Sequence, residues 1–141
     1  MTAQLFQPWP ARNVPKTKIL LVEDDPFQAR ARQNILERQF AGIARASDAA
    51  ETLILLDKTE FRENLALIVV GLHLPGLCGP SFVNELTSRF PAIPVLVIGR
   101  IGEIAPDYAG EKVRFLPHHA SSQDVLEGCS SLLSEFLIKV A

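Results

Sequence analysis

The stretch that decides the fold is "LIVVGLHLPG", residues 67–76. Its start belongs to the unbroken apolar run 65–70, which predicts a strand buried on both faces of a sheet. The proline and glycines that follow predict a loop. Gly71 therefore stands where the strand ends, the place at which a parallel α/β sheet commonly carries its functional side chains. A glycine offers none, and its presence there requires an explanation.

Strands and helices alternate on both sides of this stretch. The predicted strands cover residues 18–22, 42–46, 65–71, 93–99 and 112–117. The predicted helices cover residues 25–40, 47–58, 80–90 and 121–141, and the segment 100–111 has only a weak helical pattern. The predicted buried stripe of the first helix is Phe27, Ala31 and Ile35, extended by Leu36. Apolar strands separated by helices predict a flavodoxin-like (βα)5 doubly wound three-layer sandwich, with a five-stranded parallel sheet and a short or irregular fourth helix.

Composition points to one ordinary globular domain. The chain has 141 residues, 48% of them hydrophobic, and a net charge of −2, which gives little support for binding nucleic acid. It has neither an apolar run of membrane-spanning length nor a signal peptide, so we expect a cytoplasmic protein that does not bind membranes. Cys78 and Cys129 lack metal-ligand spacing and are expected to be free thiols. Residues 1–16, with three prolines, predict an extended or disordered extension before a domain at 17–141.

Three acidic residues, Glu23, Asp24 and Asp25, follow the first predicted strand. Because like charges repel at short range, such a run indicates a site, and one or two carboxylates could hold Mg²⁺. The alternative is structural. Asp25 would cap the next helix, with Pro26 at its first position, and Glu23 would favour the positive end of that helix.

The stretches "KILLVEDDP", "ALIVVGLHLPGLCG", "IPVLVIG" and "RFLPHH" together resemble the receiver domain of two-component response regulators, over about residues 17–141. In that family a histidine kinase passes a phosphoryl group to an aspartate at the end of the third strand. Mg²⁺, held by this aspartate and a first-strand acidic pair, neutralises charge during the transfer. A serine or threonine ends the fourth strand and a lysine the fifth. The resemblance matches Asp24 and Asp25 to the acidic pair.

The other functional positions of the family are altered. Gly71 takes the place of the phosphoacceptor, Gly99 that of the serine or threonine, and His118 that of the lysine. Phosphoryl transfer needs a nucleophilic oxygen, which glycine lacks. The resemblance therefore implies an atypical, degenerate receiver, a pseudo-receiver without a phosphoacceptor or catalytic residue. The residues of its altered pocket are Glu23, Asp24, Asp25, Gly71, Gly99, Arg100 and His118.

Losing an aspartate at position 71 weakens any Mg²⁺ site, leaving Asp24 and Asp25 as weak candidate ligands, so no cofactor is expected. Our hypothesis is that Arg100 or His118 pairs with one of these carboxylates and locks the pocket without metal. Such a contact would raise the pKa of His118.

The function predicted from these observations is that of a stand-alone, non-enzymatic signalling module that acts by binding a protein. Its partner would be a histidine kinase, a phosphotransfer protein, a regulator or a second copy in a homodimer. Two alternatives remain open. The chain could still be phosphorylated at Asp24 or Asp25, or it could sense a small molecule or metal in the vacated pocket.

Overall fold

One parallel sheet of five strands organises the residues described by the computed structural model, which are 18–71, 80–99 and 112–140. The strands are β2 (Lys18–Val22), β3 (Gly42–Ala46), β4 (Leu65–Val70), β5 (Val95–Ile98) and β6 (Val113–Leu116). The helices are α2 (Pro26–Leu36), α3 (Ala49–Leu56), α4 (Thr59–Glu63), α5 (Pro80–Arg89) and α6 (Ser122–Val140). All five predicted strands are therefore present, each within the predicted range or at its bounds.

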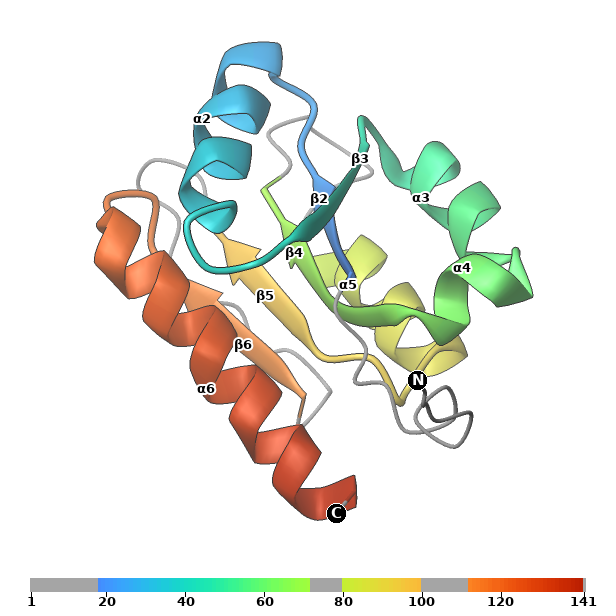
Figure 1. Cartoon of the computed structure of the whole chain (residues 1–141). Coiled ribbons are helices and arrows are strands. Elements are labelled where there is room, and N and C mark those ends of the chain that lie inside the picture. The colour runs from blue at the N-terminus through green and yellow to red at the C-terminus, as the bar shows by residue number, and fades with distance from the viewer. Residues whose placement is uncertain (1–17, 72–79, 100–111, 141) are drawn as a thin grey trace, which may run out of the picture.

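The strand order is β3-β2-β4-β5-β6, and every neighbouring pair is parallel. Helices α2 and α6 cover one face of the sheet, and α3, α4 and α5 lie on the other (Figure 1). This is the predicted flavodoxin-like three-layer sandwich. The predictions for the N-terminal extension, the loop 73–79 and the irregular segment 100–111 fall outside the described residues.

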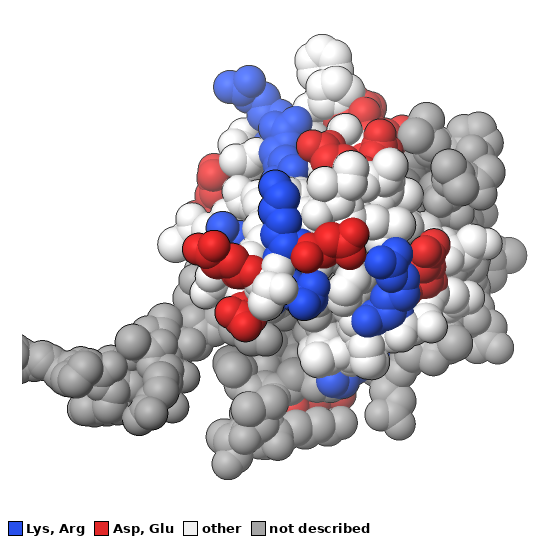
Figure 2. Space-filling model, turned by 90° about the vertical axis from the view of Figure 1, so that its right-hand side faces the viewer, with Lys and Arg blue, Asp and Glu red and all other residues white. Residues whose placement is uncertain are grey.

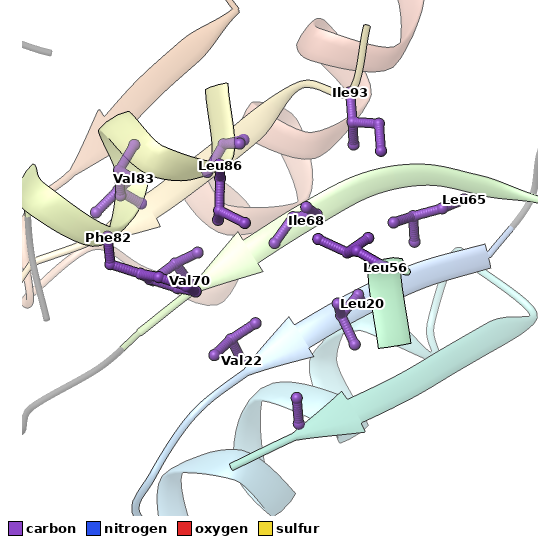
Figure 3. Packing of buried hydrophobic residues seen from close by; sticks show 13 residues of the cluster. Leu20, Val22, Leu56, Leu65, Ile68, Val70, Phe82, Val83, Leu86 and Ile93 are labelled. Carbon is purple, nitrogen blue, oxygen red and sulfur yellow. The ribbon is translucent and has the colours of Figure 1, made fainter. Parts of the chain in front are cut away.

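The core is divided between the two faces by the alternation of side chains along each strand. Leu20 and Val22 of β2 face α3 and α5, in a cluster that includes Leu56 and Leu86 (Figure 3). The residues between them face the other way. Ile19, Leu21, Leu67 and Val69 pack with Leu36 of α2 and with Val125, Cys129 and Leu132 of α6. Ile19 and Leu21 of β2 and Leu67 and Val69 of β4 thus point toward α2 and α6, whereas Leu65, before the register shift between the two strands, packs on the other face.

Helix α2 begins as predicted but buries a different face. Asp25 is its N-cap, because its Oδ1 accepts the Phe27 backbone N–H at 2.9 Å, and Pro26 follows at the first position. Of the predicted stripe only Leu36 is buried, whereas Ala31 is exposed and Ile35 is half-buried. Phe27 is 87% exposed, and the buried side chains are those of Ala29, Arg32 and Leu36. The prediction failed because it counted every charged residue as exposed, whereas Arg32 lies on the buried face of the helix.

The chain between α3 and β4 also departs from the prediction. The helix predicted over 47–58 is present as α3, and a short helix that was not predicted, α4, follows it. Arg62 of α4 donates a hydrogen bond to the Leu56 carbonyl, which lies at the end of α3 where intrahelical partners run out.

Within the described residues, no helix is both long and apolar enough to span a membrane.

Candidate functional site at the carboxyl edge of the sheet

Glu23 is a buried carboxylate directly after β2. It continues the alternation of Ile19 and Leu21 and therefore points toward α2, with only 3% of its surface exposed. Its Oε2 accepts the backbone N–H of Asp25 at 3.2 Å. A carboxylate this deeply buried requires a positive partner or a proton, because desolvation disfavours its charged form.

Arg32 supplies the positive partner. It lies on the buried face of α2, between Ala29 and Leu36, and is 7% exposed. Its Nη1 donates to Glu23 Oε1, and the two side chains form a buried ion pair. The pair joins α2 to the end of β2. Breaking such a pair by removing one partner typically costs about 3–5 kcal/mol, because an uncompensated charge stays buried.

Gly71 lies directly against this pair. It follows Val69 in the alternation of β4, and its N–H donates to the Val22 carbonyl at 2.8 Å. A Cβ atom built on Gly71 would lie 2.6 Å from Glu23 Oε1 and 3.1 Å from Arg32 Cζ, and would collide with Arg32 Nη1. The backbone of Gly71 is outside the left-handed region, so the need for glycine here is a need for space. The guanidinium of Arg32 occupies the place where a side chain at position 71 would begin.

Burial sets the protonation chemistry of the pair. It raises the pKa of Glu23 from 4.5 to about 7, while the positive charge of Arg32 and the Asp25 N–H act in the opposite direction. A neighbouring carboxylate, Asp24, adds a smaller upward contribution. Glu23 thus exchanges its proton near neutrality, although it lies in contact with an arginine.

The remaining predicted site residues lie as follows. Asp25 acts as the helix cap, so the capping interpretation is confirmed for this residue, and Glu23 is the carboxylate that faces Gly71. Gly99 is buried at the end of β5, with its N–H donating to the Leu116 carbonyl at 2.8 Å. His118 is half-buried in the turn after β6. Arg100 lies outside the described residues.

The cation found beside the carboxylates is Arg32, which the sequence analysis did not consider. A signal for it was present, because Ala29, Arg32 and Leu36 have the i, i+3, i+7 spacing of one helix face. Cys129 is a buried free thiol, and burial raises its pKa to about 12. Cys78 lies outside the described residues.

Two surface cavities lie away from this site. One, of about 650 Å³, borders Lys18, the first residue of β2, and hence the amino edge of the sheet. The other, of about 200 Å³, is near Phe90 and Ile93, before β5. Both are at the opposite end of the strands from Gly71. On the Gly71 side of the predicted vacated pocket, the guanidinium of Arg32 occupies the space.

The family model of the response regulator receiver domain matches residues 19–115. This chain belongs to that family. The receiver is 30% identical over 81 residues to the glycerol metabolism activator of Pseudomonas putida, covering 57% of this chain and 36% of that protein. It is 25% identical over 99 residues to the C4-dicarboxylate transport transcriptional regulatory protein DctD of Pseudomonas aeruginosa, covering 70% of this chain and 20% of that protein. The receiver thus spans only a minor part of the length of these relatives.

Solved structures agree on the fold. The receiver matches the signal receiver domain of an HD domain-containing protein from Pseudomonas fluorescens Pf-5 with a TM-score of 0.72 and 22% identity, over 89% of this chain and 93% of that one. It matches the receiver domain of a signal transduction histidine kinase from Syntrophus aciditrophicus with a TM-score of 0.70 and 21% identity, over 84% and 91% of the two chains.

The Mg²⁺ of the family does not fit the residues of this receiver. Both carboxylate oxygens of Glu23 already accept hydrogen bonds, one from Arg32 and one from Asp25 N–H. Gly71 supplies no carboxylate, and within the described ranges no group of three His, Cys, Asp or Glu side chains could hold a metal ion. A guanidinium also repels a second cation at the same carboxylate.

Proposed function

We propose that this receiver is a non-enzymatic interaction module of a two-component pathway that does not work by aspartyl phosphorylation. One observation carries the proposal: the buried Glu23–Arg32 pair fills the position in front of Gly71. Phosphoryl transfer requires a nucleophilic oxygen aligned with the donor and charge neutralisation at the phosphoryl oxygens. Position 71 provides no side-chain oxygen, and the cation beside it is already bound to a carboxylate.

Of the two alternative phosphorylation sites, Asp24 and Asp25, the second has little support. Asp25 Oδ1 already accepts the Phe27 N–H, and losing that cap would weaken α2. The sensor alternative has little support as well, because Arg32 occupies the space that a small ligand would need beside Gly71.

The proposed partner is a histidine kinase, a phosphotransfer protein or a regulator of such a pathway, or a second copy of the chain. Phe27 supports a protein contact, since its ring is 87% exposed at the start of α2, next to the site. The face that carries α3 and α4 has positive and negative side chains intermixed, which does not favour nucleic acid (Figure 2). We expect the protein to act in the cytoplasm.

The test is phosphorylation with a small-molecule donor. The receiver is incubated with acetyl phosphate and MgCl₂, and its intact mass is measured at intervals after rapid acidification. A receiver that has an aspartate at the position of Gly71 serves as the positive control. We expect no mass increase in this chain under conditions that fully modify the control. A gain of one phosphoryl group that hydroxylamine removes, mapped to Asp24 or Asp25, would overturn the proposal.

A further inference from the structure

The Glu23–Arg32 pair has a consequence for metal binding. We propose that Arg32 is the resident cation of the acidic site, a tethered substitute that excludes divalent ions, and that removing its side chain opens the site to Mg²⁺ or Mn²⁺. This inference rests on the proposed function, because it explains what takes the place of a metal ion beside the buried Glu23 of a receiver without a phosphoacceptor.

The first step of the argument is charge. Glu23 is 3% exposed and contacts Arg32, which is itself 7% exposed. The two opposite charges neutralise each other in a place from which water is largely excluded, where electrostatic interactions are strong. A divalent ion at Glu23 would have to approach within a few ångströms of a buried positive charge. The guanidinium therefore acts against metal binding twice, by engaging the carboxylate and by repelling the ion.

The second step is geometry. Arg32 is fixed on α2 by the burial of Ala29 and Leu36 on the same face. Because Arg32 belongs to the same chain, its guanidinium has a high effective concentration beside Glu23. A free metal ion would have to compete with this tethered group for the carboxylate. The guanidinium fits only because position 71 has no Cβ, whose place it takes. Gly71 and Arg32 thus pack together, and this contact connects the end of β4 with α2.

The experiment uses Arg32→Ala, which leaves room for a hydrated ion beside Glu23 and Asp24. Thermal unfolding is followed with and without MgCl₂. The matched control is Arg30→Ala, which removes an exposed arginine from the same helix. We expect Mg²⁺ to leave the midpoints of the wild type and Arg30→Ala unchanged. In Arg32→Ala we expect a rise of about 3–6 °C at a concentration tenfold above Kd. Adding Glu23→Gln to that variant should abolish the rise.

A second measurement does not depend on the folding of the variant. MnCl₂ added to the isotope-labelled wild-type chain broadens the amide signals of residues near any bound ion. We expect no selective broadening at Glu23, Asp24 or Gly71. Selective broadening there overturns the inference, as does an Arg32→Ala variant that folds without responding to Mg²⁺. Neither result touches the proposed function, which fails only if the chain accepts a phosphoryl group.

Discussion

The substitution Gly71→Ala tests whether the glycine is present to accommodate Arg32. The added Cβ would lie 2.6 Å from Glu23 Oε1, well inside ordinary van der Waals contact, and would collide with Arg32 Nη1. Overpacking of this kind costs about 1–3 kcal/mol. Alanine also restricts the unfolded chain, which stabilises the protein by about 0.4–1 kcal/mol where the backbone is compatible. The net expectation is a destabilisation of about 1–2 kcal/mol, or a lower Tm by about 3–6 °C.

The assay is a double-mutant cycle, measured by urea unfolding of the wild type, Gly71→Ala, Arg32→Ala and the double variant. Arg32→Ala alone should cost about 3–5 kcal/mol near pH 8, because it leaves Glu23 buried without its partner. Since the main colliding group is then absent, alanine at position 71 should cost less in this background. We expect a coupling free energy of about 1–2 kcal/mol between the two positions.

Two results would refute the reasoning. If Gly71→Ala raises the stability, the space beside position 71 is open and the unfolded-state effect decides. If alanine costs the same with and without Arg32, the collision does not involve the guanidinium, and the glycine serves another purpose.

Two further predictions concern the residues around the pair. Burial raises the pKa of Glu23 from 4.5 to about 7. Between pH 4.5 and pH 7, Glu23 therefore holds a proton in the folded chain that it has released in the unfolded chain. The free energy of unfolding should therefore fall by about 3 kcal/mol as the pH rises from 4.5 to 7, then level off. Urea unfolding across this range checks it, and Glu23→Gln should flatten the slope. Asp25→Ala should cost about 1 kcal/mol, like the control Asp48→Ala at the cap of α3, if Asp25 acts as a cap alone. A much larger loss for Asp25 in the same unfolding assay would contradict this.

The fold could be predicted because its signals are local. Strands buried on both faces appear as unbroken apolar runs such as 65–70, and Asp25 followed by Pro26 marks a helix start within two residues. The short helix α4 was not predicted. Its Arg62 donates a hydrogen bond to the last carbonyl of α3, and such a contact leaves no periodic pattern in the sequence. Local signals therefore recover the order of elements better than their ends.

The site could be predicted only in part, because its two halves come from separate segments. Through the family resemblance, Gly71 indicates that a nucleophile is missing, and the acidic run at the end of β2 indicates a site. That Arg32 pairs with Glu23 follows only when two patterns are combined: the alternation of side chains along β2 and the set of residues on one face of α2. Glu23 must point toward α2, and Arg32 must lie on the face of α2 that points back. An amphipathic pattern excludes an arginine from that face unless its partner is known.

Gly71 and Arg32 depend on each other, and this dependence determines what an aspartate at position 71 would require. A side chain at position 71 displaces the guanidinium, and a chain without Arg32 leaves Glu23 buried without its partner. An aspartate introduced at position 71 alone would place a second carboxylate beside Glu23 and the guanidinium of Arg32. Because one cation cannot neutralise both, this change alone is expected to disturb the site before it can restore any chemistry. Gly71 is therefore part of a packed arrangement that includes α2, and placing an aspartate at this position requires changing Arg32 as well.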